Sequence, residues 1–224
     1  VMRRNVDIKI LLFDNRIYGL TKGQYSPTSN KGMINRSAPM GTVEEAVEPV
    51  ALALASGASF VARTDAAYLR HLVQLIVEAH KHKGTAFLHI YQNCYVYNDG
   101  VFDDFTAKEI RDDRNIIVEH GKPLIYGKKR DKGLRFKGTK FEIVEFEPGN
   151  PPEDITIYDE TNLAFAFALS KLYWPEYPVP MGVLRRVEQP SFEELIYGQV
   201  ERAKQKFSTD LNKLIYSGDV WEVK

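Results

Sequence analysis

The chain has 224 residues, in which 30 lysines and arginines balance 30 aspartates and glutamates. This balance gives no case for binding nucleic acid or a membrane surface through bulk charge. No apolar run reaches the roughly 18 residues that a membrane-spanning helix needs. A hydrophobic content of 44% is ordinary for a globular protein, and a single cysteine excludes an internal disulfide and fits a location in the reducing cytoplasm.

The most informative stretch covers residues 10–24, ILLFDNRIYGLTKGQ, where a predicted buried strand over 8–13 ends in the polar pair Asp14-Asn15. Ligand sites in α/β sheets lie just beyond the carboxyl ends of the strands. The amide oxygen of Asn15 and the backbone carbonyl of Ile17 are hard ligands of the kind that Mg²⁺ prefers, with waters and a phosphate group completing its shell. The stretch therefore predicts a site for Mg²⁺ and a phosphate-bearing cofactor.

The chain after this stretch alternates between helix and strand. We expect a helix over 43–56, a strand over 60–63, a helix over 66–82 and a strand over 85–91. Thr42 with Glu45 forms a capping-box pattern for the first of these helices, although Pro49 is compatible with a kink or a later start. Such alternation is typical of a parallel sheet with right-handed crossovers.

The second half of the chain has a mixed pattern. We expect a helix over 107–120, a β-ribbon over 124–146, a helix over 162–171, an irregular segment over 173–183 and a helix over 192–207 capped by Ser191. The chain is therefore divided into an α/β part, residues 1–100, and a mixed α+β C-terminal extension, residues 101–224.

The histidines do not suggest a metal site. His80 and His82 lie two positions apart near a helix end, so they do not share a helix face, and we expect surface or helix-ending positions for them. His89 lies within a strand and is expected to be packed rather than to bind a metal.

The run DNRIYGLTKGQYSPT resembles the thiamine-diphosphate-binding segment of the beta subunit of 2-oxoacid:ferredoxin oxidoreductases. The metal motif of that family has two halves, a Gly-Asp-Gly segment and an asparagine in a turn like this one. Asn15 and the carbonyl of Ile17 match the second half, whereas no Gly-Asp-Gly occurs in these 224 residues. The resemblance implies a thiamine-diphosphate-binding-type parallel sheet flanked by helices, of which residues 1–100 are the C-terminal portion, and a chain whose N-terminal part is missing.

The same resemblance implies roles for the residues of the turn. It implies cofactor contacts from Tyr18, Gly19, Leu20 and Thr21, with the glycine letting the backbone come close to the cofactor. Lys22 matches a position that in some members meets the substrate carboxylate, a task that suits a mobile point charge. A surface charge in a glycine turn explains Lys22 equally well, so both interpretations stay open.

Cys94 ends the segment IYQNC, at the same edge of the predicted sheet as Asn15. An isolated cysteine is most simply a buried, inert side chain. The segment resembles the part of the family that carries the fourth cysteine ligand of a [4Fe–4S] cluster, whose other three ligands come from the region missing here. Because four thiolates are normally needed, the resemblance implies that Cys94 is one ligand of a cluster that this chain cannot hold alone.

For the function, the resemblance implies a subunit that works with an alpha subunit. The complete enzyme would decarboxylate a 2-oxoacid on thiamine diphosphate, pass electrons through the [4Fe–4S] cluster to ferredoxin and transfer the acyl group to coenzyme A. The isolated segment is then expected to be inactive, and the identity of the 2-oxoacid stays open. Two alternatives remain: a thiamine-diphosphate-dependent decarboxylase or lyase without electron transfer, and a non-catalytic subunit remnant that serves as an interaction module.

The most basic stretch of the chain is residues 128–140, KKRDKGLRFKGTK. One interpretation is a solvated, flexible loop. The other is an electrostatic landing patch, which would suit an acidic ferredoxin or the phosphates of coenzyme A. The sequence does not separate these interpretations.

Overall fold

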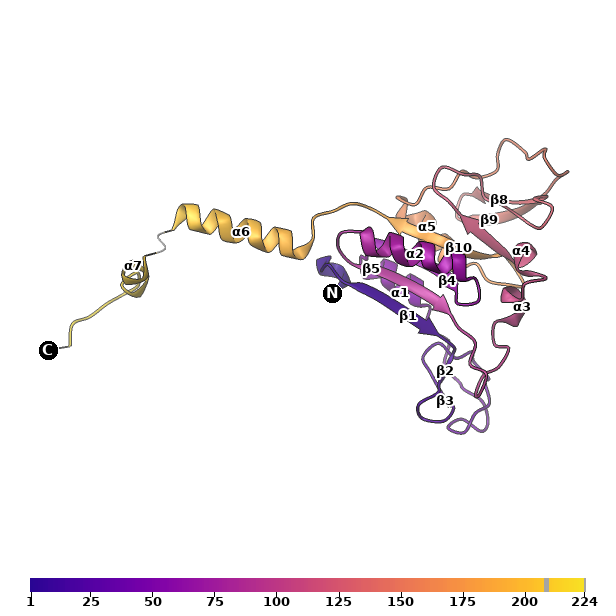
Figure 1. The fold of residues 1–224 in the computed structure, drawn as a ribbon, viewed down its shortest axis with the longest axis horizontal. Coiled ribbons are helices and arrows are strands. Elements are labelled where there is room, and N and C mark those ends of the chain that lie inside the picture. The colour runs from indigo at the N-terminus through magenta and orange to yellow at the C-terminus, as the bar shows by residue number, and fades with distance from the viewer. Residues whose placement is uncertain (208–209, 224) are drawn as a thin grey trace.

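The computed structural model describes residues 1–207 and 210–223, and a five-stranded sheet forms its centre (Figure 1). In spatial order the strands are β1 (Lys9–Asp14), β5 (Ala86–Tyr91), β4 (Phe60–Asp65), β10 (Val179–Arg186) and β6 (Asn115–Val118). Strands β1, β5 and β4 run parallel, whereas β10 and β6 run parallel to each other and antiparallel to β4.

Helices cover both faces of this sheet. Helix α2 (Leu69–Lys81) packs on one face through Leu75 and Ala79, and helices α1 (Pro49–Ala55) and α5 (Leu163–Ser170) pack on the other. Every residue of β5 is buried, as expected for a parallel strand with helices on both sides. Strand β1 is an edge of the sheet, and Leu11 and Phe13 are exposed there.

The register of the parallel strands fixes which side chains meet at the carboxyl edge. Asp14 of β1 and Asp65 of β4 both lie opposite Tyr91 of β5. Two residues earlier in these strands, Arg63 of β4 lies opposite His89 of β5, on the same face of the sheet. Residues far apart in the sequence therefore form one polar row next to the point where the strands end.

Smaller elements surround the sheet. A hairpin of β2 (Ile17–Tyr18) and β3 (Gln24–Tyr25) follows β1, and β7 (Ile125–Tyr126), β8 (Lys132–Lys137) and β9 (Lys140–Glu145) form a separate antiparallel sheet. Three one-turn helices complete this set: η1 (Met2–Arg4), α3 (Asp103–Thr106) and α4 (Arg111–Arg114).

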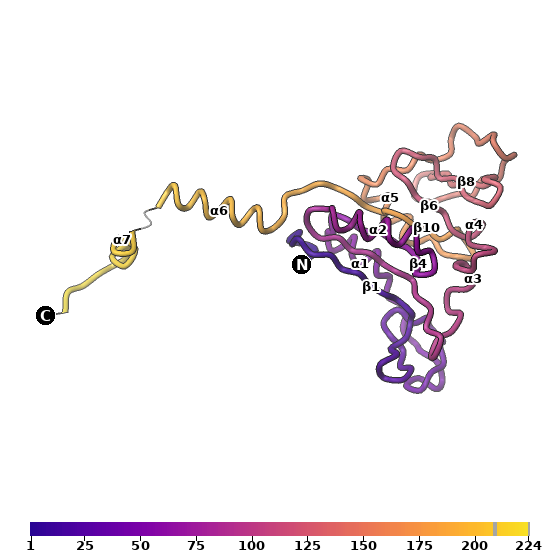
Figure 2. Tube along the Cα trace, in the orientation of Figure 1, coloured from indigo at the N-terminus to yellow at the C-terminus, as the bar shows by residue number. Residues whose placement is uncertain are grey.

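The C-terminal part extends from the body as an arm. Helix α6 (Phe192–Lys206) has no buried residue and points away from the sheet, and α7 (Leu211–Ile215) lies beyond it (Figures 1 and 2). The predicted cap of α6 is confirmed, because Ser191 and Glu194 form a complete capping box. Among the described residues, the helices are all too short or too polar to cross a membrane.

The α/β architecture predicted from the sequence is confirmed, but several elements differ. The first helix starts at Pro49 with Glu48 as its N-cap, because the hydroxyl of Thr42 donates to the carbonyl of Asn30 instead of capping. The predicted helix over 107–120 is wrong: α4 is a single turn, and the chain then enters β6, where Ile116 is fully buried beside β10.

The segment over 173–183, expected to be irregular, contains most of β10. Proline usually excludes a central strand because it has no N–H for the ladder. Here Pro180 pairs only with β6, since pairing with β4 begins at Gly182. The division of the chain at residue 100 remains a proposal, and the central sheet draws β6 and β10 from beyond that residue.

Candidate functional site

The polar turn after β1 is held by its own side chains. The carboxylate of Asp14 accepts the N–H of Arg16 at 3.0 Å, and Oδ1 of Asn15 accepts the N–H of Ile17 at 3.2 Å. Arg16 adopts a left-handed backbone with φ of 56°. Two successive side-chain turns therefore end the strand abruptly and leave Asn15 at the carboxyl edge of the sheet.

Asn15 is suited to bind a metal ion that takes most of its other ligands from a cofactor and from water. Its amide oxygen makes one hydrogen bond and keeps a second lone pair, and its backbone carbonyl accepts the Nδ2–H of Asn98 at 2.9 Å. In the described part of the chain, no group of three or more histidine, cysteine or acidic residues is arranged to hold a metal ion. The turn thus fits Mg²⁺ bound largely by phosphate and water, with one or two neutral protein oxygens.

The hairpin that carries Lys22 projects from the body. Lys22 has a φ of 66° and Gly23 a φ of 97°, and the N–H of Gly23 donates to the carbonyl of Tyr18 at 3.0 Å. A Cβ on Gly23 would lie 3.1 Å from the ring of Tyr97, so this glycine permits a close approach. Leu20 is 98% exposed at the tip. The hairpin therefore presents the side chains of Leu20 and Lys22 to solvent.

Cys94 lies beside this turn. The thiol is free and half-buried, and Cys94 forms a β-bridge with Asn98, whose side chain bonds to Asn15. The structure thus brings together the turn of Asn15 and the segment of Cys94, as the shared sheet edge predicted. Cys94 is also not deeply buried, which is less typical of an inert core cysteine.

The sequence interpretation missed a buried, hydrogen-bonded Asp–His pair at the same edge. Asp14 Oδ2 lies 3.0 Å from His89 Nε2, and the hydroxyl of Thr28 donates to Asp14 Oδ1 at 2.6 Å. Burial opposes ionisation of Asp14, but the hydrogen bonds from His89 and Thr28 hold the pKa of its carboxyl below the ordinary value. Burial lowers the pKa of His89, so a neutral imidazole donates to a carboxylate.

This pair gives the stability a pH dependence. We expect the free energy of unfolding to fall as the pH decreases from 7 to 5, because the unfolded chain protonates His89 near pH 6.5 whereas the folded chain does so only at lower pH. The loss is up to about 1.4 kcal/mol per pH unit for this histidine. Asp14 acts in a separate window: its lowered pKa stabilises the fold above about pH 4, and this contribution is lost below it.

Urea denaturation at pH 7, 6 and 5 tests this expectation. His89→Gln keeps an amide that can donate to Asp14 but does not titrate, so its stability should fall less steeply than that of the wild type. His80 is exposed, and His80→Gln should retain the wild-type slope. Equal slopes for the wild type and His89→Gln would contradict the assignment.

Two cavities, each of about 560 Å³, adjoin the carboxyl end of the sheet. The first, which we call the Asp14 cavity, lies between the turn of Asp14, the start of α1 and the segment after α5. A fully buried arginine supports its wall: Arg63 Nη2 donates to Glu48 Oε1 at 2.8 Å and to the hydroxyl of Tyr173 at 3.1 Å.

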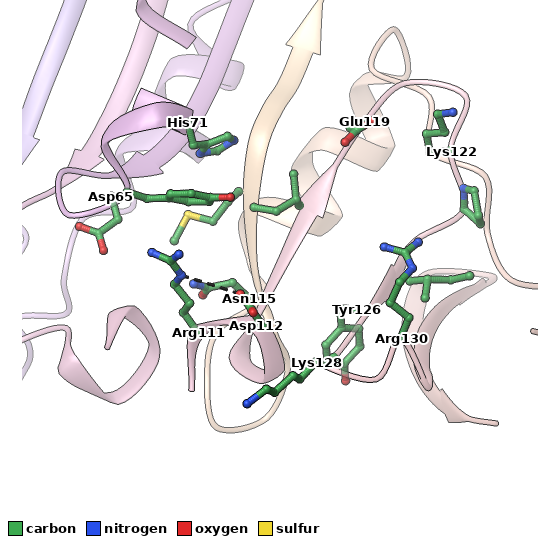
Figure 3. Close-up of a pocket in the computed structure, with 16 residues that line it drawn as sticks. Asp65, His71, Arg111, Asp112, Asn115, Glu119, Lys122, Tyr126, Lys128 and Arg130 are labelled. Atoms are coloured by element: carbon green, nitrogen blue, oxygen red, sulfur yellow. Dashed lines mark ion pairs between the residues drawn. The ribbon is translucent and has the colours of Figure 1, made fainter. Parts of the chain in front are cut away.

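The second cavity lies between α2, α4, β6 and the turn from β7 to β8 (Figure 3). Figure 3 shows His71 and Arg111 on one side of it and Tyr126 and Arg130 on the other. Lys128 and Arg130, from the basic stretch, line this cavity, whereas Arg135 pairs with Asp154 at 2.6 Å. The stretch over 128–140 is therefore not a flexible loop, since most of it is β8 and its turns.

The sequence of this chain is similar to that of known thiamine pyrophosphate enzymes. Residues 1–90 match the family model of the C-terminal, thiamine pyrophosphate-binding domain of thiamine pyrophosphate enzymes. The chain is 35% identical to the 2-oxoglutarate oxidoreductase subunit KorB of Mycobacterium tuberculosis, over 99% of this chain and 61% of that protein. It is 50% identical to a 2-oxoacid:ferredoxin oxidoreductase subunit beta from Sulfolobus, over 43% of this chain and 32% of that protein.

A solved structure agrees with these sequence matches. The 2-oxoglutarate:ferredoxin oxidoreductase from Magnetococcus marinus, determined with 2-oxoglutarate, coenzyme A and succinyl-CoA bound, superposes with a TM-score of 0.70 and 27% identity. The match covers 98% of this chain and 61% of that chain. The predicted resemblance and the thiamine-diphosphate-binding-type α/β fold are thereby confirmed. This chain is a relative of the beta subunits of 2-oxoacid:ferredoxin oxidoreductases and spans about three fifths of the length of the M. tuberculosis subunit.

Proposed function

We propose that the protein is the cofactor-binding beta subunit of a 2-oxoacid:ferredoxin oxidoreductase, which works in the cytoplasm with an alpha subunit. The complete enzyme converts a 2-oxoacid and coenzyme A to an acyl-CoA and passes electrons to ferredoxin. The observation that carries this proposal is the contact between two segments: Asn98, which follows Cys94, donates a hydrogen bond to Asn15. An alternative enzyme without electron transfer would have no need for a cysteine beside the cofactor turn.

Each residue at the edge has a role in this proposal. Asn15 and the carbonyl of Ile17 would hold Mg²⁺, which would help to bind the phosphate groups of the cofactor. Tyr18, Gly19, Leu20 and Thr21 contact the cofactor. Thiamine diphosphate, when bound, supplies the carbanion chemistry of decarboxylation. Lys22, carried on the exposed tip of the hairpin, binds the carboxylate of the 2-oxoacid as a point charge.

Cys94 is proposed as a ligand of a [4Fe–4S] cluster whose other ligands lie outside these residues. Cys94→Ser in the complete enzyme should remove most of the iron and acid-labile sulfide but leave thiamine diphosphate bound, because the asparagine turn is intact. Iron, sulfide and thiamine diphosphate analyses of the purified variant measure this. Intact iron and sulfide in Cys94→Ser would rule out the ligand assignment.

The function itself is tested with the complete beta subunit purified together with its alpha subunit. The complex should contain thiamine diphosphate, magnesium and iron, and should reduce ferredoxin only when a 2-oxoacid and coenzyme A are both present. Decarboxylation without ferredoxin reduction would favour a lyase instead. A complex that binds no thiamine diphosphate would favour a non-catalytic interaction module.

A further inference from the structure

The Asp14 cavity contains an imbalance between hydrogen-bond donors and acceptors. It opens at the carboxyl ends of β1 and β5, and its volume of about 560 Å³ is that of a small-molecule site. Its lining comes from five parts of the chain: the β1 turn, the loop before α1, β5, the region of α3, and the segment after α5. Lys22 and Leu20 do not line it, whereas Asp14 and Arg16, which flank the proposed Mg²⁺ ligand Asn15, do. The cavity therefore adjoins the asparagine turn and leaves the tip of the hairpin outside.

The buried carboxylates of this cavity are already satisfied. Asp14 accepts hydrogen bonds from His89, Thr28 and the backbone of Arg16. Glu48 Oε1 accepts from Arg63 at 2.8 Å and from the N–H of Val50 at 3.1 Å. These two carboxylates therefore have little capacity left for a cationic ligand. Asp104 also lines the cavity but is exposed to solvent.

The donors, by contrast, lack acceptors within the described residues. The hydroxyl of Tyr91, whose residue is 1% exposed, has no hydrogen-bond partner there. Burial raises the pKa of Tyr91 to about 12, so the hydroxyl keeps its proton. The guanidinium of Arg16 lies over the ring of Phe102 at 4.9 Å, and neither it nor the ammonium of Lys171 forms an ion pair with any described carboxylate. Of these three groups only the Tyr91 hydroxyl is fully buried, whereas Arg16 is half-buried and Lys171 is exposed at the rim. A buried donor without a partner is costly, so a ligand or a water is expected to meet the Tyr91 hydroxyl.

We propose that the Asp14 cavity binds a small organic carboxylate. The anion would accept hydrogen bonds from Tyr91 and pair with Arg16 and Lys171, while the side chains of Phe105, Tyr173 and Trp174 give its carbon skeleton an aromatic wall. His89 Nδ1, also buried without a partner, is the acceptor left for a hydroxyl on the ligand or for a water. This site goes beyond the proposed function and does not depend on it.

Isothermal titration calorimetry of the purified protein with succinate, acetate and inorganic phosphate as probes tests the proposal. Succinate should bind, with acetate weaker and phosphate weakest. Tyr91→Phe, which removes one hydroxyl, and Lys171→Gln, which removes one charge at the rim, should each weaken succinate binding by about tenfold. Lys128→Gln, at the other cavity, should leave the affinity unchanged.

Several outcomes would overturn the proposal: no heat of binding for any carboxylate, tighter binding of phosphate than of succinate, or the same loss in Lys128→Gln as in Lys171→Gln.

Repeating the titration with magnesium and thiamine diphosphate present separates this site from the cofactor site. Unchanged succinate affinity supports a separate carboxylate site. Competition would assign the anion to the cofactor instead. Asn15→Ala should retain succinate binding even though it loses the cofactor, so the two proposals fail independently.

Discussion

Replacing Asn15 with alanine in the complete enzyme is expected to abolish retention of thiamine diphosphate. The side chain of Asn15 has two tasks at the carboxyl edge of β1. Its oxygen is the proposed Mg²⁺ ligand, and the same oxygen accepts the N–H of Ile17 at 3.2 Å, which fixes where the carbonyl of Ile17 points. Alanine removes one ligand directly and releases the other, so the metal loses both protein oxygens on this side of its shell.

The measurement is the thiamine diphosphate content of the purified complex, by mass spectrometry or fluorescence after oxidation. Asn162→Ala is a matched control, since Asn162 Oδ1 also accepts a backbone N–H, that of Phe165 at 3.1 Å, but at the start of α5. The control should lose about 1 kcal/mol of stability as a lost helix cap and keep its cofactor. Unchanged cofactor content in Asn15→Ala would refute the metal role.

Local sequence patterns correctly predicted the strand ends and helix caps that are determined by neighbouring residues. The strand that ends at Asp14 and the cap of α6 at Ser191 depend on residues within a few positions of one another. The helix expected over 162–171 is also present, as α5, with Asn162 as its N-cap. The meeting of Asn15 with Cys94 was also predictable, because the parallel order of strands sends both chain segments to one edge.

The features that the sequence did not reveal depend on long-range pairing. Nothing near Pro180 indicates a central strand, since β10 forms only where β4 and β6 supply its partners. In the same way Asp14 and His89 become a hydrogen-bonded pair only through the register of β1 with β5. The presence of Arg63 in β4 and of His89 in β5, both otherwise largely apolar strands, could have indicated buried polar contacts. A buried strand keeps such residues only where they have partners.

The largest stability change is expected for Glu48→Ala. The side chain of Arg63 is fully buried, and its ion pair with Glu48, itself only 12% exposed in its side chain, is the charge that compensates it. Removing Glu48 leaves a buried guanidinium whose Nε and Nη1 already lack partners. Loss of one member of a buried pair costs about 3–5 kcal/mol. The N-cap of α1 is lost as well, because Glu48 accepts the N–H of Val50.

Urea denaturation of Glu48→Ala should therefore show a large fall in the unfolding midpoint. Glu45→Ala serves as the control. Glu45 pairs with Lys31 at 2.6 Å, but both side chains are more than half exposed, so its loss should change stability by less than about 1 kcal/mol. Combining Glu48→Ala with Arg63→Met removes both charges while the N-cap stays absent, and should recover part of the loss, since the cost comes mainly from the uncompensated charge. If the double variant were no more stable than Glu48→Ala, the buried guanidinium would not be the cause, and the fall would belong to the start of α1.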